Sequence, residues 1–375
     1  MKKRIKYLLY SSVAMFMFSA STAWAQYVKV ISEDGTVLWE KIKGEINGRD
    51  IKIYNDSEED DDCVIADSIA GTIDLTEVWS RRGGKGTHYQ VTSIGDDAFS
   101  GCTDLISVII PSSVTSIGDD AFSDCRSMIS VTIPSGLTSI GDDAFSGCRN
   151  LSTFMRIPSS VTSINEGVFE GCSRLPFVSI PSSVTSIGAG AFEGCSRLTF
   201  VRIPSSVTSI GEWAFKDCHN LVFVRIPSSV TSFNKGVFSG CSKLALIVTE
   251  GDDSVFDAIG ILDISFDGSV TIPSSITNIG DEAFEGCRSL TSVKIPSSVL
   301  SIGKEAFKNC AGLNSITSYI TEVFETGKDA FQDIPSSTTL YVPKGLVCTY
   351  QSKKDWNHIS NIKENVPAVS MTTSK

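Results

Sequence analysis

The sequence predicts a repeat solenoid, an elongated fold in which copies of one short unit stack on each other. A segment close to Ile-Pro-Ser-Ser-Val-Thr-Ser-Ile-Gly recurs along the chain, followed by Ala-Phe or Val-Phe and then usually by Gly-Cys or Asp-Cys. Most of the cysteines, phenylalanines and prolines repeat at a spacing of 23 residues. One copy of this length cannot bury its own apolar edge, so the copies must stack to form a core.

The cysteines and the phenylalanines mark the period independently. The repeating cysteines are Cys102, Cys125, Cys148, Cys172, Cys195, Cys218, Cys241, Cys287 and Cys310. The repeating phenylalanines are Phe99, Phe122, Phe145, Phe169, Phe192, Phe215, Phe238, Phe284, Phe307 and Phe331. One cysteine interval is 46 residues, or two periods, and its missing cysteine falls at Ile264. We therefore expect about ten repeats, one of them decayed.

Each copy contains the signals for a strand, a bend and a short turn. In the copy that starts at Leu290, the pattern Leu-x-x-Val-x-Ile has the alternation of a strand, and Pro296 ends it because proline has no N–H to donate. Gly303 permits a turn. The acidic residues before Ala-Phe suit one helical turn with an aspartate cap. Burial of each repeating phenylalanine is expected to contribute roughly 1.5–3 kcal/mol.

The segments outside the repeats predict four regions. Residues 1–25 have a basic start, an apolar run and Ala23-Trp24-Ala25, as in a secretory signal peptide. We expect an N-terminal β-rich cap at 26–90, the solenoid at 91–343 with the decayed copy near 250–268, and a C-terminal cap and tail at 344–375. Trp356, Ile359 and Ile362 are candidates to cover the last repeat. No membrane span is expected after removal of the signal, because no later apolar run is long enough.

The repeat, with its Leu, Val, Ile-Pro, Ala-Phe and Cys positions, resembles that of the BspA-like bacterial leucine-rich repeat surface antigen family. The resemblance covers about two thirds of the chain and implies a right-handed α/β solenoid. It further implies a parallel β-sheet on a concave face, short helical turns on the convex side, and export to the cell surface. Members of the family are associated with adhesion to host matrix proteins and to other bacteria.

Composition and charge argue against several classes of function. The net charge of −11 becomes −15 when the four cations of the signal segment are removed, so we expect no nucleic-acid partner. His88, His219 and His358 are too scattered for a histidine-centred metal site. We find no Ser-His-Asp arrangement and no phosphate-binding loop, so we expect no catalysis, no cofactor and no metal.

Two repeated features allow alternative interpretations. The cysteine ladder could hold buried thiols, disulfides or a metal array, and Cys63 and Cys348, outside the ladder, could be free or paired. The acidic pairs, such as Asp119-Asp120 and Asp142-Asp143, could bind calcium between repeats or could cap turns on a solvated rim.

The strand positions that face away from the core supply the candidate site. In Leu-x-x-Val-x-Ile the third and fifth residues should line the concave surface, where most copies have Ser or Thr. Four consecutive copies instead place Phe177, Phe200, Phe223 and Leu246 at the third position, beside Ser179, Arg202, Arg225 and Val248 at the fifth. These residues could form a partner-binding site, because phenylalanine and arginine carry binding energy at interfaces, or they could simply pack across the strands.

The sequence thus predicts a secreted, extracellular or cell-surface bacterial protein, with the periplasm as the alternative location. We expect it to bind a protein ligand, either a host extracellular matrix protein or a bacterial surface protein, as an adhesin. Two alternatives stay open: a non-catalytic structural scaffold, and a surface protein that binds glycans through the same aromatic residues.

Overall fold

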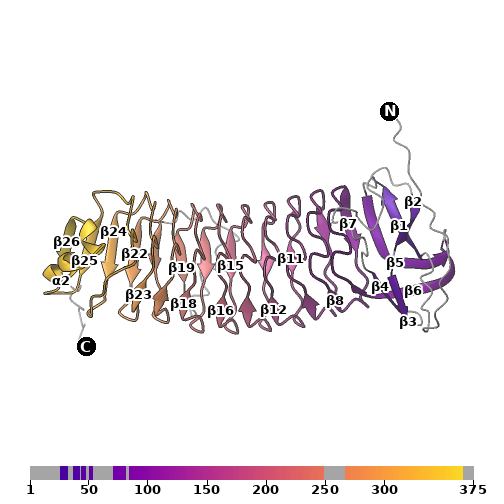
Figure 1. Ribbon diagram of the computed structural model, residues 1–375, viewed down its shortest axis with the longest axis horizontal. Helices are drawn as coiled ribbons and strands as arrows, with labels where there is room; N and C mark the ends of the chain where they lie inside the picture. Colours follow the sequence, from indigo (N-terminus) through magenta and orange to yellow (C-terminus); the bar gives the residue numbers. More distant parts are fainter. Residues whose placement is uncertain are drawn as a thin grey trace, which may run out of the picture.

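The computed structural model describes residues 26–32, 37–42, 44–47, 50–53, 71–81, 84–248 and 267–365. The predicted signal segment 1–25, most of the predicted decayed copy and the tail from 366 lie outside these residues. Figure 1 shows a rod of stacked rungs with a larger sheet at the N-terminal end and helix α2 (Val347–Ser352) at the C-terminal end.

Two rows of parallel strands run along the rod. The first row, at the position that precedes the proline in most repeats, contains β7 (Leu105–Ile109), β9 (Ser130–Val131), β11 (Met155–Arg156), β13 (Val178–Ser179), β15 (Phe200–Arg202), β17 (Phe223–Arg225), β19 (Leu246–Val248), β20 (Ser269–Thr271), β22 (Ser292–Ile295), β24 (Ser315–Ser318), β25 (Thr339–Val342) and β26 (Asn361–Glu364). The second row, after the proline, contains β8 (Ser116–Ile117), β10 (Ser139–Ile140), β12 (Ser163–Ile164), β14 (Ser186–Ile187), β16 (Ser209–Ile210), β18 (Ser232–Phe233), β21 (Asn278–Ile279) and β23 (Ser301–Ile302).

The register of both rows follows from the repetition. Equivalent residues of neighbouring copies lie opposite each other, as Ile187 lies opposite Ile210 in the second row and Phe200 opposite Phe223 in the first. Because side chains alternate between the two faces of a strand, a stack in this register puts one column of equivalent side chains in the core and the next column outside.

The N-terminal sheet extends both rows and closes the end of the rod. It contains β1 (Gln26–Ser32), β2 (Val37–Ile42), β3 (Gly44–Asn47), β4 (Asp50–Ile53), β5 (Gly71–Arg81) and β6 (Lys85–Ile94). Strand β5 pairs in parallel with β7 and so starts the first row, whereas β6 pairs in parallel with β8 and starts the second. Antiparallel pairing of β5 with β1 then covers the edge that β5 would otherwise expose.

The segments around Ala-Phe differ from the expected helical turns. Alternate N–H groups donate to carbonyls of the next rung, from Asp97 to Asp119, from Phe99 to Ala121 and from Gly101 to Ser123, all at 2.8 Å. Asp97 and Gly101 have φ of 52° and 69°, outside the helical region. The prediction of short helical turns on the convex side is therefore wrong, because these N–H groups bond between rungs and not along a helix.

In the view of Figure 1 the rod runs nearly straight. A helix about 10 Å wide on one side would force rungs spaced by about 4.8 Å on the strand side to fan out. Here the turn side carries its own ladder of hydrogen bonds between rungs, so both sides have similar spacing.

Each rung buries the apolar residues that define the repeat. In one rung the eight core side chains are at most 2% exposed: Leu198, Val201, Ile203, Val207, Ile210, Ala214, Phe215 and Cys218. The repeating phenylalanines stack from rung to rung with ring centroids 5.2–5.8 Å apart. They form a continuous aromatic column through the core.

The rungs that precede and follow the decayed copy in the sequence are direct neighbours in the stack. Strand β18 pairs with β21, and Phe238 lies 5.8 Å from Phe284, although their sequence separation is two periods. That the decayed copy forms a rung of the solenoid stays a prediction, because most of it lies outside the described residues.

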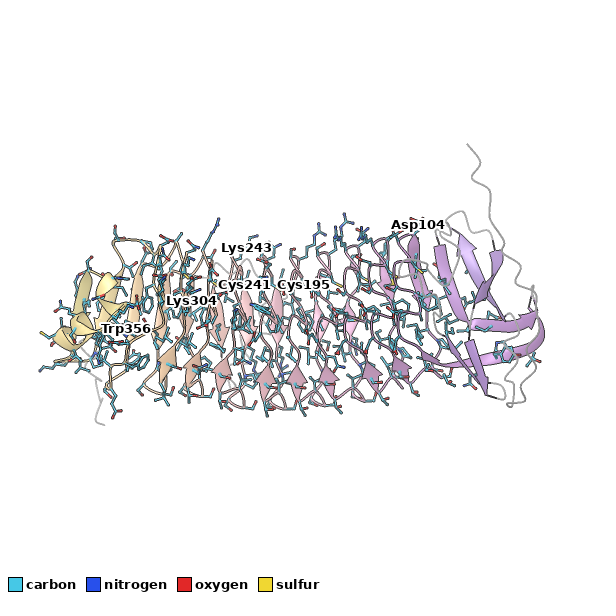
Figure 2. The ribbon with its side chains drawn as sticks, in the orientation of Figure 1. Asp104, Cys195, Cys241, Lys243, Lys304 and Trp356 are labelled. Atoms are coloured by element: carbon cyan, nitrogen blue, oxygen red, sulfur yellow. The ribbon has the colours of Figure 1, made fainter. Side chains whose placement is uncertain are left out.

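The C-terminal end of the core is covered by aromatic side chains. Trp356, in the short 3-10 helix η1 (Trp356–His358), is fully buried and lies 5.0 Å from the Phe331 ring (Figure 2). Its indole N–H donates to the carbonyl oxygen of Phe324 at 3.1 Å. The hydroxyl of Tyr350, from α2, bonds to Ser318 and to the Ile320 carbonyl oxygen.

Candidate functional site

The outer face of four neighbouring first-row strands carries aromatic and arginine side chains. We call it the β11–β17 face and define it by Phe154, Arg156, Phe177, Ser179, Phe200, Arg202, Phe223 and Arg225. In each strand the residue between the aromatic and the polar position points into the core, as Val178 and Val201 do at 2% and 1% exposure. These strands therefore alternate as the sequence predicts, except that β17 also buries Phe223 and Arg225.

Phe154 and Arg156 were missed by the sequence analysis. Met155 pairs with Val178 and Arg156 with Ser179, so Phe154 occupies the same position as Phe177. The copy has one extra residue, which displaces Phe154 when positions are counted from the preceding cysteine. Counting backwards from the proline would have found it, because Phe154 precedes Pro158 by the same four residues that separate Phe177 from Pro181.

The aromatic rings of the face stack on each other. The centroid of Phe177 lies 4.4 Å from that of Phe154 and 4.5 Å from that of Phe200, with interplanar angles of 26° and 40°. The Arg156 guanidinium lies 6.0 Å from the Phe154 centroid, within the range of a cation–π contact. Phe154 is nonetheless 54% exposed, and Phe177 and Phe200 are partly exposed. The rings of this face thus pack against each other across the strands and are also accessible from outside.

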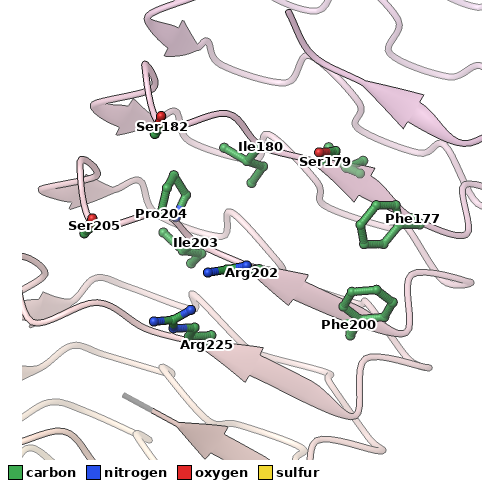
Figure 3. A pocket seen from close by; sticks show the side chains of 11 residues that line it. Phe177, Ser179, Ile180, Ser182, Phe200, Arg202, Ile203, Pro204, Ser205 and Arg225 are labelled. Atoms are coloured by element: carbon green, nitrogen blue, oxygen red, sulfur yellow. The ribbon is translucent and has the colours of Figure 1, made fainter. Parts of the chain in front are cut away.

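Two neighbouring cavities lie along the β11–β17 face. One, of about 460 Å³, is lined by Phe177, Phe200, Arg202 and Arg225 together with the Pro-Ser bends of two rungs (Figure 3). The other, of about 630 Å³, lies beside Phe154 and Arg156 and is also lined by Ser179, which belongs to both. The two cavities therefore form one surface feature that runs along several rungs.

Two of the predicted site residues are less accessible than the alternation implied. Phe223 is 1% exposed and Arg225 is 8% exposed, whereas Arg202 is exposed. Phe223 lies in a strand that is paired on both sides, with β15 and with β19, and Phe200 lies directly opposite it in β15. The accessible part of the face is thus its β11 to β15 portion; of Leu246 the structure describes only its backbone place in β19.

The cysteine ladder consists of buried thiols from Cys125 to Cys310. Each Sγ donates to the carbonyl oxygen of the phenylalanine one rung away, from Cys125 to Phe99 at 3.0 Å and from Cys218 to Phe192 at 3.1 Å. Burial raises the pKa of these thiols, to about 12 for Cys310. Cys102, at the start of the ladder, is instead disulfide-bonded. Cys348 is a free, exposed thiol, and Cys63 lies outside the described residues.

The acidic pairs bond to the backbone of the neighbouring rung. The Asp119 carboxylate accepts from the backbone N–H of Asp142 at 2.8 Å, and the Asp96 carboxylate accepts from that of Asp119 at 3.1 Å. This is capping between rungs and not at a helix start. In the described part of the chain, no group of three or more His, Cys, Asp or Glu side chains could hold a metal ion.

Comparison with known proteins identifies the family to which the repeats belong. The family model described as "BspA type Leucine rich repeat region" matches residues 87–176, 162–259 and 263–365, which is well over half of the chain. No functionally curated protein gives a match. Among the residues with described positions, no helix is both long and apolar enough to cross a membrane.

Several solved bacterial structures are similar. A leucine-rich repeat protein of T. pallidum is 24% identical over 66% of this chain and 87% of its own, with a TM-score of 0.38. A leucine-rich cell surface protein of Faecalibacterium prausnitzii is 24% identical over 83% and 97%, with a TM-score of 0.33. The pneumococcal vaccine antigen PcpA is 15% identical over 90% and 98%, with a TM-score of 0.43.

Proposed function

This chain belongs to the BspA-type leucine-rich repeat family, and on that premise we propose that it is an exported, non-enzymatic adhesin that binds a protein partner through the β11–β17 face. Leucine-rich repeats generally mediate protein binding. The basic and apolar start of the sequence, with Ala23-Trp24-Ala25, supports export through a signal peptide. Partners of the proposed adhesin are extracellular matrix proteins of a host or proteins on other bacterial cells.

The observation that carries the proposal is the exposed aromatic column. In β7, β9, β20, β22 and β24 the equivalent position holds serine, and neighbouring serines bond to each other, as Ser130 does to Ser107 at 3.0 Å and Ser292 to Ser269 at 2.7 Å. Serine is therefore sufficient for the strands to stack. The phenylalanines add exposed apolar area next to arginine and two cavities, a combination that marks protein interfaces.

The experiment measures binding of residues 26–375 to a panel of immobilised matrix proteins and to whole bacteria. The test variant is Phe177→Ser with Phe200→Ser, which installs the residue that other rungs carry at this position. The matched control is Leu300→Ser, which removes a 72% exposed apolar side chain next to the second-row strand β23. Thermal unfolding of all three proteins verifies that the fold is kept.

We expect saturable binding by the unmodified chain and by Leu300→Ser, and at least about tenfold weaker binding by the double variant, the effect of losing one or more interface anchors. Equal binding by all three proteins would show that the face is not the site. No binding to any member of the panel would instead favour a structural scaffold.

A further inference from the structure

Charge is divided between two parts of the repeat. From 105 to 248 every arginine lies between a cysteine and the next proline, the segment that forms the first-row strands and their flank. In the same stretch every aspartate and glutamate lies between a proline and the next cysteine, the segment that forms the second row and the turns. Because the rungs are in register, this division places a basic side and an acidic side along the rod of a chain whose net charge is negative.

The two sides also differ in their ion pairs. On the turn side, lysines contact carboxylates: Lys216 lies 2.7 Å from Glu193 and Lys308 lies 3.1 Å from Glu305. On the strand side, Arg126 lies 3.2 Å from Asp124. The other strand-side arginines Arg149, Arg156, Arg174 and Arg197 have no carboxylate partner among the described residues, and Arg149, Arg174 and Arg197 are exposed. No acidic residue occupies the aromatic or the polar position of any described first-row strand from β9 to β17. The basic side therefore has positive charge that the described part of the fold does not neutralise.

The ring geometry distinguishes between two kinds of acidic ligand. A sugar chain stacks its rings on exposed aromatic faces. Phe177 has its two faces turned toward Phe154 and Phe200, and Arg156 lies near the Phe154 ring, so the column offers mainly ring edges. Edges suit contact with apolar side chains, which need no parallel stacking. Guanidinium groups beside them suit carboxylates, which they bind through paired N–H donors.

We propose that the β11–β15 part of this face binds an acidic, extended segment of a protein partner, in which carboxylates alternate with apolar side chains. The arginines bind the carboxylates, and the edges of Phe154, Phe177 and Phe200 contact the apolar side chains. This inference rests on the proposed function and specifies the chemistry of its partner. It also predicts that binding weakens with salt, since exposed ion pairs are screened.

The experiment titrates residues 26–375 into a fluorescein-labelled twelve-residue peptide of alternating glutamate and leucine and follows anisotropy. A peptide of alternating lysine and leucine tests the sign of the charge, and heparin tests a sulfated glycan. The binding variant is Arg156→Gln, because Arg156 lies on the face and lines one of its cavities. The matched control, Lys216→Gln, removes the same charge from the turn side. Sedimentation velocity of each protein alone tests whether a second copy is the occupant.

We expect saturable, salt-sensitive binding of the glutamate peptide, at least about tenfold weaker for the arginine variant, because the variant loses charge-assisted hydrogen bonds to carboxylates. The lysine control should bind like the unmodified chain. Absence of binding, equal binding of the lysine–leucine peptide, preference for heparin with the same arginine dependence, or self-association lost in the arginine variant would each overturn the inference. If binding to the protein panel persists and still requires Phe177 and Phe200, only the acidic character of the partner is refuted, and the proposed function stands.

Discussion

At the scale of single residues, the repeat selects for backbone conformation as much as for burial. The residue before each described ladder cysteine has a positive φ, and glycine, aspartate or asparagine occupies it, as in Gly101 at 69°, Asp124 at 54° and Asn309 at 60°. Glycine has no steric cost in this region, and aspartate and asparagine tolerate it better than other residues. The alternation of Gly-Cys and Asp-Cys in the sequence is explained by this one requirement.

Gly236 tests the requirement for a residue that tolerates positive φ, at a position where a side chain of the adjacent rung also lies close. Its φ is 58°, and a Cβ there would lie 2.2 Å from Cδ1 of Trp213 on the adjacent rung. We expect Gly236→Ala to lower the free energy of unfolding by more than the roughly 1–2 kcal/mol that a left-handed alanine costs alone. Chemical denaturation measures this. Gly345→Ala is the control, because Gly345 has a φ of 79° and nothing within 4 Å of its added Cβ; equal losses in both variants would show that the contact with Trp213 is relieved without cost.

The cysteines make a second prediction at this scale. The thiolate is the nucleophile, and burial raises the pKa of the ladder thiols, so they should resist alkylation in the native state. Iodoacetamide at pH 8 followed by peptide mass spectrometry should label Cys348, which is exposed, and leave Cys125 to Cys310 unlabelled until a denaturant is added. Labelling of Cys195 at the rate of Cys348 in the native protein would contradict the buried ladder.

At the scale of the element, the turns concentrate carboxylates that the fold does not fully compensate. Burial raises the pKa of Asp143, and the neighbouring Asp120, Glu166 and Asp142 carboxylates raise it further. A raised pKa in the native state means that the native state binds more protons than the unfolded state in the interval above the unfolded value of about 3.8. This group therefore makes the protein less stable as the pH rises through that interval.

We expect Asp143→Asn to increase the thermal unfolding temperature at pH 7, and the gain to shrink toward zero as the pH falls to about 3.8, the ordinary pKa of aspartate. Asparagine also keeps a residue that tolerates the φ of 52°. Glu305→Gln is the matched variant of opposite sign, because hydrogen bonds from Lys308 and Lys304 lower the pKa of Glu305. It should lower the unfolding temperature at pH 7 and have little effect at low pH. A pH-independent effect of Asp143→Asn would mean that packing, and not charge, determines it.

The same element shows what the sequence can and cannot predict. The columns of Phe215, Cys218 and Val201 could be predicted because burial repeats with the period. The form of the turn could not, since Asp before Ala-Phe is compatible both with a helix cap and with a left-handed residue whose neighbours bond to the next rung. The place of Phe154 was missed because an extra residue changes the count from one end only, and the burial of Phe223 was missed because it depends on its surroundings and not on its position in the strand.

At the scale of the whole molecule, a stack of rungs is stabilised by interfaces between neighbours, so its ends decide where unfolding begins. The N-terminal end is covered by the antiparallel pairing of β1 and β5, which extends over several residue pairs. The C-terminal end has a shorter strand pairing, four residue pairs between β25 and β26, together with the packing of Trp356 against Phe331 and Tyr350 at centroid distances of 5.0 Å. We infer that the C-terminal rungs open before the central ones.

Replacing Trp356 by alanine tests this asymmetry. Truncation of a large buried aromatic costs about 3–5 kcal/mol, and here it also exposes the Phe331 ring and leaves the Phe324 carbonyl without its indole donor. Hydrogen exchange followed by mass spectrometry should show lost protection in the rungs of Phe307 and Phe331, with the rungs around Phe192 protected as before. Since stability in a stack is a sum over neighbouring interfaces, the loss should decline with distance from the cap. A uniform loss of protection along the rod would show instead that the solenoid unfolds as one cooperative unit, in which case the β11–β17 face would lose its structure together with the cap.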